Sequence, residues 1–208
     1  MTDYEAKRAA LVDRLASRED LAPAAEAAMR AVPRHEFVPE NRQSDAYADR
    51  PLPIGEGQTI SAPHMVAIMT DLLDLEPGLR VLEIGTGCGY HAAVTAEVVG
   101  AENVYSVEYH ESLAERARET LTRLGYGDIS VRAGDGKEGW PAHAPYDRAY
   151  LTCAAAELPD PIAAQVQSGG IILAPLGQDR QRLFRIEKRP DGTLKREPRM
   201  GVRFVRLQ

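Results

Sequence analysis

Short apolar runs alternate with amphipathic segments along most of the chain, and turns rich in glycine separate them. Val81, Leu82 and Ile84 form one such run, which predicts a buried strand. Residues 91–99 are rich in alanine and valine and end at Gly100, a pattern typical of a helix with a glycine C-cap. Strand, glycine turn and helix in this order are the beginning of a βαβ unit.

The same alternation continues on both sides of this unit. We expect helices over residues 4–17, 23–32, 63–76, 91–99, 110–124 and 159–167. Gly169-Gly170 breaks the last of these helices. We expect strands over residues 81–84, 103–108, 129–133, 146–152 and 171–175. Two further alternating segments, residues 182–188 and 200–207, are separated only by a turn region and predict an antiparallel strand pair at the sheet edge. The pattern therefore predicts an α/β fold with a mostly parallel sheet, an N-terminal helical cap and a C-terminal antiparallel pair.

The segment after Pro63 is strongly amphipathic. From Met65 onward, apolar residues recur at i, i+3, i+4, i+7 and i+8, which predicts one buried helix face. Ser61 lies where the N-cap of this helix is expected, and spacing alone favours a capping role for its hydroxyl.

Three glycines at alternate positions, Gly85, Gly87 and Gly89, follow the strand at Val81. Without Cβ atoms the chain can turn sharply and bring its backbone close to a ligand at the N-terminus of the next helix. The dinucleotide-binding pattern G-x-G-x-x-G would need a glycine at Tyr90, so that reading fails by one residue. The alternative is a tight turn that binds nothing.

Two acidic residues end neighbouring strands. Glu108 lies 21 residues after Gly87, a distance at which an acid can accept hydrogen bonds from both ribose hydroxyls of a nucleoside. Asp135 lies between two glycines at the end of the next strand, where it could accept a hydrogen bond from an adenine amino group. The alternatives are an acid favoured by a helix dipole at Glu108 and a solvated turn residue at Asp135.

Composition narrows the class of protein. With 208 residues, a net charge of −6 and a pI of about 5.4, the chain lacks the basic balance typical of nucleic-acid-binding proteins. We expect no membrane span, because no window of 18 apolar residues exists, and no signal peptide. Two separated cysteines, Cys88 and Cys153, suggest a reducing compartment without disulfides and make a metal site unexpected. The expected location is the cytoplasm.

Six separated motifs, in order, point to one family. They are Val32-Pro33-Arg34 with Phe37-Val38; Pro53-Ile54-Gly55 with Gly57 to Met65; the E-x-G-x-G-x-G motif from Glu83 to Gly89; Gly134-Asp135-Gly136; Ala144-Pro145-Tyr146-Asp147; and Gly169-Gly170 before a strand ending in Pro175. The glycine motif resembles the first motif of Rossmann-like class I methyltransferases that use S-adenosylmethionine (SAM). The complete set resembles the protein-L-isoaspartate O-methyltransferases over almost the full chain.

The resemblance implies a single methyltransferase domain over residues 1–208. Residues 1–60 would form the N-terminal helical cap and active-site loop, residues 61–178 the SAM-binding core, and residues 179–208 the C-terminal antiparallel strands. The implied activity is SAM-dependent methylation of the free carboxylate of L-isoaspartyl residues in damaged proteins and peptides, which starts their repair through a succinimide. The implied partners are these substrates alone, without nucleic acid or membrane, and the expected state is a monomer.

The resemblance also implies the site. It identifies Ser61 as the active-site serine and implies no metal. The cofactor contacts that it implies are Gln58, Thr59, Ile60, Ser61, His64, Glu83, Gly85, Thr86, Gly87, Gly89, Glu108, Tyr109, Asp135 and Gly136, with a further contact near Gln208.

One departure from the family pattern lies after the fourth strand of the core. The family has an Ala-Pro or Pro-Pro pair there, whereas this chain has Ala154-Ala155-Ala156-Glu157 and lacks the first proline. Two alternatives to the isoaspartyl activity stay open. One is methylation of another carboxylate or a small molecule, and the other is a SAM-binding module without methyl transfer. No Asn/Asp-Pro-Pro-aromatic motif follows that strand, which argues against a nucleic-acid amino-methyltransferase.

Overall fold

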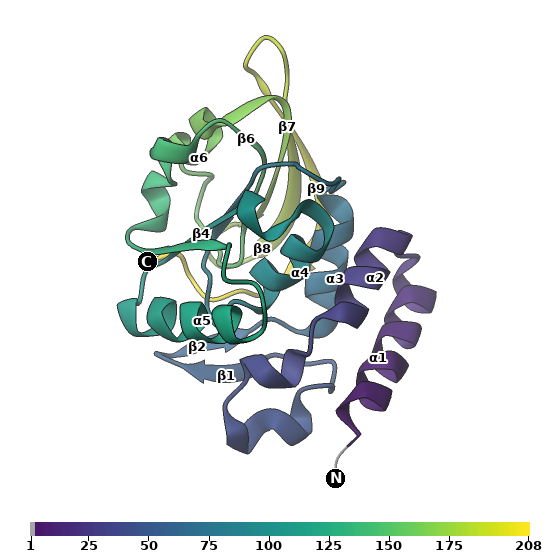
Figure 1. Ribbon diagram of the computed structural model, residues 1–208. Coiled ribbons are helices and arrows are strands. Elements are labelled where there is room, and N and C mark those ends of the chain that lie inside the picture. The colour runs from purple at the N-terminus through teal and green to yellow at the C-terminus, as the bar shows by residue number, and fades with distance from the viewer. Residues whose placement is uncertain (1–2) are drawn as a thin grey trace.

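The computed structural model describes residues 3–208, in which helices cover both faces of a seven-stranded sheet (Figure 1). The strands in spatial order are β5 (Ser130–Ala133), β4 (Val104–Glu108), β3 (Val81–Ile84), β6 (Tyr146–Leu151), β7 (Val166–Leu176), β8 (Gln181–Lys188) and β9 (Leu194–Val202). The first five are parallel, and β8 is antiparallel to both of its neighbours. The predicted α/β class with a C-terminal antiparallel pair is confirmed.

The helices connect and cover these strands. They are α1 (Tyr4–Glu19), α2 (Pro23–Ala31), α3 (Pro63–Leu72), α4 (Tyr90–Val99), α5 (Glu111–Arg123) and α6 (Asp160–Gln165), with short 3₁₀ turns η1 (Arg34–Phe37), η2 (Glu40–Asp45), η3 (Ala101–Asn103), η4 (Gly136–Glu138) and η5 (Pro141–His143). A small hairpin, β1 (Leu52–Gly55) and β2 (Gln58–Ile60), precedes α3. Among the described residues no helix has the length and apolar character needed to span a bilayer.

Each face of the sheet has its own apolar core. On β3, Val81 belongs to the core shared with α1–α5, whereas Leu82 and Ile84 belong to the core beneath α6. This division follows from the alternation of side chains along a strand. Because both faces are covered, β3 is buried along its whole length and its sequence is a continuous apolar run interrupted only by Glu83.

Two predictions at the C-terminal side of the sheet are wrong. The helix α6 ends at Gln165 and β7 begins directly after it at Val166, so Gly169 and Gly170 lie inside a strand with irregular pairing and do not break the helix. The last strand is β9, six residues earlier than the expected segment 200–207. It is an edge strand with both faces largely solvated, and such a strand has no apolar alternation to detect.

The N-terminal helices pack beside the core helices. In Figure 1, α1 and α2 lie on the α3–α4 side of the sheet, and α2 packs directly against α4. Pro63 is the first residue of α3, a position that needs no backbone donor, and the N-cap is Ala62 without a side-chain cap. The expected capping role of Ser61 is therefore wrong, and no other hydrogen-bond partner of its hydroxyl lies within residues 3–208.

The carboxyl ends of the parallel strands meet at one edge. The strand order reverses at β3, which lies between β4 and β6, and in open α/β sheets ligands bind at such a point. The last six residues return to the same edge, because Ala154 accepts a hydrogen bond from the Leu207 N–H and donates to the Val205 carbonyl. The C-terminus therefore closes one side of the site.

Candidate active site

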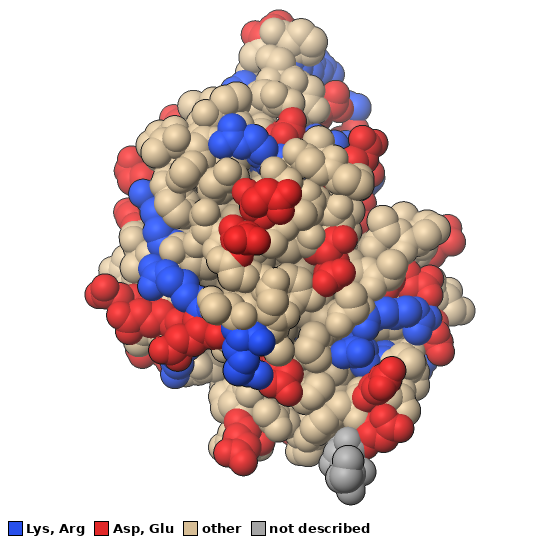
Figure 2. All heavy atoms as spheres, viewed as in Figure 1, with Lys and Arg blue, Asp and Glu red and all other residues tan. Residues whose placement is uncertain are grey.

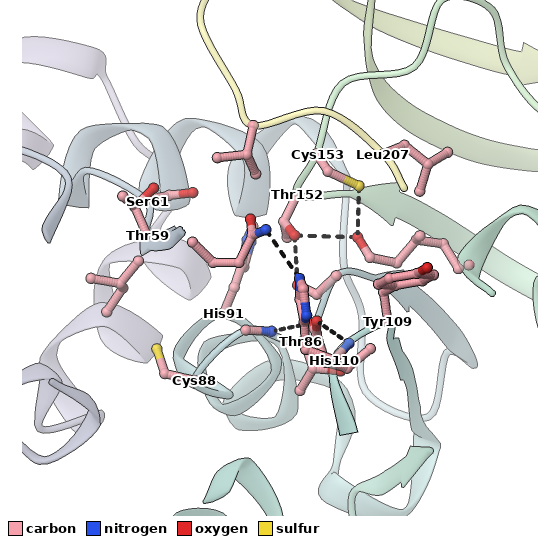
Figure 3. Close-up of a pocket in the computed structure, with 18 of the residues that line it drawn as sticks. Thr59, Ser61, Thr86, Cys88, His91, Tyr109, His110, Thr152, Cys153 and Leu207 are labelled. Carbon is pink, nitrogen blue, oxygen red and sulfur yellow. Dashed lines mark hydrogen bonds between the residues drawn. The ribbon is translucent and has the colours of Figure 1, made fainter. Parts of the chain in front are cut away.

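A cavity lies at this reversal point, between the hairpin, the glycine turn and the C-terminal segment. Figure 3 shows Thr59 and Ser61 on one side of it and Cys153 and Leu207 on the other. The site residues expected from the sequence that line it are Gln58, Thr59, Ile60, Ser61, Gly85, Thr86, Gly87, Glu108, Tyr109 and Gly136. We call it the cofactor pocket.

The glycine turn brings backbone to the pocket wall at two positions where φ is positive. Gly85 has φ +97°, and a Cβ there would lie 2.3 Å from Thr152 Oγ1. The Thr152 hydroxyl donates to the Gly85 carbonyl. Gly87 has φ +56°, and a Cβ there would lie 3.2 Å from Ile54 Cδ1. Both glycines are therefore needed for the shape of the turn.

The carboxylate of Glu108 connects β4 to the glycine turn. Its Oε2 accepts from the Gly87 N–H at 2.8 Å, and its Oε1 accepts from the His110 N–H at 3.0 Å. Glu108 is buried and lines the pocket. Each carboxylate oxygen has a second lone pair, so Glu108 can still accept two hydrogen bonds from a bound diol.

Two expected contacts lie on the surface beside the pocket. His64 lines a neighbouring groove, and its Nδ1 lies 2.8 Å from Asp49 Oδ1. Asp135 is exposed, and its carboxylate accepts from the Lys137 N–H at 2.9 Å, which caps η4. Its neighbour Gly136 lines the pocket.

Two other expected contacts lie behind the pocket wall. Gly89 is the N-cap of α4, and a Cβ there would lie 3.1 Å from Leu121 Cγ, so this glycine allows α4 and α5 to pack closely. Glu83 is fully buried in β3. Its carboxylate accepts from the Tyr150 hydroxyl at 2.9 Å and from the Ser106 hydroxyl.

The Glu83 carboxyl is connected to the pocket through hydroxyls. Ser106 Oγ lies 2.5 Å from Thr86 Oγ1, and Thr86 lines the pocket. Burial raises the pKa of Glu83 to about 8, although the hydrogen bonds from Ser106 and Tyr150 lower it. Glu83 therefore supports the glycine turn from behind, through Ser106 and Thr86.

Replacing Glu83 by glutamine should flatten the pH dependence of stability above neutrality. The raised pKa of Glu83 means that the native state keeps a proton that the unfolded state, with a glutamate pKa of 4.5, has lost. Stability is therefore lost as pH rises towards 8. Burial lowers the pKa of His91 to about 3, so below pH 6.5 this imidazole makes the stability rise with pH, which is the opposite of the effect of Glu83. Between pH 7 and 8 we expect the wild-type free energy of unfolding to fall by about 1 kcal/mol.

Chemical denaturation at pH 7 and pH 8 measures this difference. Glu83→Gln removes the titrating group and should keep the free energy of unfolding nearly constant over that interval. The same decrease in both proteins would contradict a protonated carboxyl at this position.

Several pocket residues were not expected from the sequence. They come from the turn before α4 and its first residues, from the N-cap of α5, from the residues after β6 and from the C-terminal segment: Cys88, Tyr90, His91, His110, Thr152, Cys153, Val205, Arg206 and Leu207. Gln208, for which the resemblance implied a contact, also lines the pocket. These positions have no local pattern of their own, because tertiary packing brings them to the sheet edge.

Both thiols are protonated at neutral pH. Burial raises the pKa of Cys88 to about 11 and that of Cys153 to about 12, and both cysteines are free. Neither is therefore a nucleophile. Within residues 3–208 no three His, Cys, Asp or Glu side chains are grouped as metal ligands.

A buried arginine holds Ser61 from behind. Arg34 Nη2 donates to the Ser61 carbonyl at 2.8 Å, and Arg34 Nε donates to the Ala46 carbonyl at 2.9 Å. The Arg34 guanidinium lies 4.9 Å from the ring centroid of Tyr90, a pocket residue. Arg34 thus ties the N-terminal segment, the Ser61 loop and the start of α4 together.

Comparisons with known proteins agree with this geometry. A family described as protein-L-isoaspartate(D-aspartate) O-methyltransferase (PCMT) matches residues 6–208. The chain is 51% identical over 207 residues to protein-L-isoaspartate O-methyltransferase 2 of Archaeoglobus fulgidus, a match that covers 99% of this chain and 94% of that protein.

Two solved structures share the fold. One, named protein-L-isoaspartate O-methyltransferase, is 32% identical with a TM-score of 0.87; the match covers 96% of this chain, which spans 65% of that longer one. The other is a Plasmodium falciparum structure described as a putative protein-L-isoaspartate O-methyltransferase in complex with S-adenosyl-L-homocysteine, with a TM-score of 0.84 at 24% identity and coverage of 97% and 98%. The chain therefore belongs to the protein-L-isoaspartate(D-aspartate) O-methyltransferase family.

Proposed function

We propose that this protein uses SAM to methylate the free α-carboxylate of L-isoaspartyl residues in damaged proteins and peptides. One observation carries the proposal: Ser61, Thr59 and Thr152 line both the cofactor pocket and a second, more open cavity beside it. A methyl donor in the first cavity and a peptide in the second would meet at Ser61. The names of the matching family and relatives support the choice of substrate.

The pocket fits SAM by its shape and its donor set. Gly85 and Gly87 provide a wall without side chains, and Glu108 offers acceptors for ribose hydroxyls. We propose as cofactor contacts the expected residues that line this pocket, with Gly136, Arg206, Leu207 and Gln208 closing its far side. We do not propose His64, Glu83, Gly89 and Asp135 as direct contacts, because they do not line this pocket.

The reaction needs orientation more than proton transfer. When bound, SAM supplies an electrophilic methyl group on a sulfonium. A carboxylate has a pKa near 4 and is already an anion at neutral pH, so no general base is required. The chain must hold the carboxylate oxygen in line with the methyl carbon and exclude water. Within residues 3–208 the Ser61 hydroxyl has no hydrogen-bond partner, so it is free to donate to the carboxylate.

The methyl ester formed in this way is more reactive than the carboxylate. The following backbone nitrogen can attack the ester carbonyl, which forms a succinimide and releases methanol. Hydrolysis of the succinimide then yields a mixture that includes normal aspartate. This sequence starts the repair of the damaged chain.

The test is methyl transfer to two peptides that differ only in one linkage. We expect transfer to a peptide with L-isoaspartate and a rate at least about 100-fold lower with L-aspartate at the same position. The isoaspartyl linkage adds one methylene to the main chain and moves the free carboxylate, and a displacement of about 1 Å can cost on the order of 100-fold in rate. Radiolabelled methyl transfer at saturating SAM measures both rates.

The control is a third peptide, in which the free α-carboxylate of the isoaspartyl residue is replaced by its amide. This peptide should accept no methyl group. Equal methylation of the isoaspartyl and aspartyl peptides would favour a carboxyl methyltransferase of another substrate. Methylation of neither, with SAM still bound, would favour a binding module without isoaspartyl activity.

We propose further that the protein acts as a monomer in the cytoplasm and needs no nucleic acid. Among the described residues the one exposed large hydrophobic side chain is Tyr109, which lines the cofactor pocket. Figure 2 shows acidic and basic side chains interspersed over the visible face, which carries no continuous basic patch. Light scattering of the purified protein measures its molar mass in solution, and we expect the mass of one chain.

A further inference from the structure

The second cavity is a groove with its own chemistry. It runs from the start of α3 past the turn before β8 to the C-terminal segment that follows β9, and we call it the basic groove. Residues 178–181 and 201–206 form one wall, and Ala62, His64 and Met65 lie on the other. It opens into the cofactor pocket at Ser61 and Arg206.

Three arginines line this groove without acidic partners. Arg180, Arg203 and Arg206 are exposed, and none has a carboxylate oxygen within 4.0 Å among residues 3–208. The one carboxylate in the lining is Asp179. The whole chain has a net charge of −6, so this concentration of cations runs against its overall charge.

The arginine closest to the reaction is held in place by the backbone. Arg206 lines both cavities. Its two neighbours anchor the segment, because the Val205 carbonyl accepts from the Ala154 N–H and the Leu207 N–H donates to the Ala154 carbonyl. On the opposite wall the imidazole of His64 is paired with Asp49. Among residues 3–208 the charges of the groove lining without an ion-pair partner are therefore the three arginines and Asp179, an excess of positive charge. The lining therefore carries more positive than negative charge and would favour an acidic segment of a bound peptide.

We propose that the basic groove holds the peptide flanking the isoaspartyl residue and selects for acidic side chains at the neighbouring positions. The inference rests on the proposed function and adds a substrate preference to it. A single exposed ion pair contributes little to the binding free energy, but the contributions of two or three arginines to one acidic peptide segment add up. Lysine at the same positions of the peptide would be repelled.

The test uses three isoaspartyl peptides of equal length, whose flanking positions carry glutamate, glutamine or lysine. Binding is measured by fluorescence anisotropy with S-adenosylhomocysteine present, and kcat/KM by methyl transfer. We expect glutamate flanks to exceed lysine flanks about tenfold in both measurements. At 1 M salt, where the screening length is about 3 Å, the ratio should approach one.

Arg180→Glu with Arg203→Glu should abolish or invert this preference. The matched control is Arg189→Glu with Arg196→Glu, which changes the net charge equally at exposed positions outside the groove and should keep the ratio. Equal binding of glutamate and lysine peptides, or an unchanged ratio in the groove variant, would overturn the inference. Selective binding without methyl transfer to any peptide would instead overturn the proposed activity and leave the groove preference standing.

Discussion

Gly87→Val is expected to abolish SAM binding, with an affinity at least about 100-fold lower than that of the wild type. Gly87 lies in the pocket wall with φ +56°, a conformation that is poor for a β-branched residue. A side chain there would meet Ile54. It would also fill space beside the Glu108 carboxylate, which accepts a hydrogen bond from the Gly87 N–H. Isothermal titration calorimetry with SAM measures the loss.

A second valine separates ligand binding from backbone strain. Gly78 also has positive φ, +83°, but a Cβ there would meet nothing within 4 Å, and Gly78 lies outside the pocket. Gly78→Val should therefore lose some stability and keep SAM affinity. If both valine variants bound SAM equally well, the glycine turn would not be the cofactor site.

Ser61→Ala is expected to lower kcat/KM for an isoaspartyl peptide by about 100-fold, with a much smaller loss of SAM affinity. The Ser61 hydroxyl lies where the two cavities meet, and removing it leaves the carboxylate without the group that orients it. Stability should change by less than about 1 kcal/mol, because Ala62 is the N-cap of α3 and Ser61 does not cap that helix. Steady-state kinetics and thermal denaturation of the same variant distinguish these effects.

Ser168→Ala is the matched control, because Ser168 is exposed on β7 and lines neither cavity. It should keep both activity and stability. A Ser61 variant with full turnover would show that other groups orient the substrate, and Thr59 or Thr152 would then be the next residues to test.

Much of the fold follows from local sequence. The central strands β3 and β4 are buried along almost their whole length, so each one is a short run rich in apolar residues that can be recognised without knowledge of its neighbours. The glycine turn directly follows β3, and Glu108 is the last residue of β4. Their approximate place at the sheet edge is therefore determined by the sequence, because the carboxyl ends of parallel strands share one edge.

Tertiary structure alone decided which of these residues reach the pocket. Glu83 alternates away from the pocket within β3, Gly89 faces α5, and Asp135 turns outward to cap η4, although all three belong to the recognised motifs. Within a short motif the chain direction changes at nearly every residue. Adjacent positions can therefore face a ligand, a helix or solvent.

The limits of β9 and the course of the last six residues were likewise decided by packing. An edge strand exposed on both faces carries no apolar period, so the sequence determined that strands follow β7 but not where the last one ends. Residues 205–208 line the pocket, and backbone hydrogen bonds of Val205 and Leu207 with Ala154 hold them there. Such contacts join residues about 50 positions apart in the sequence. They use backbone groups that almost every residue carries, so no side-chain pattern predicts them.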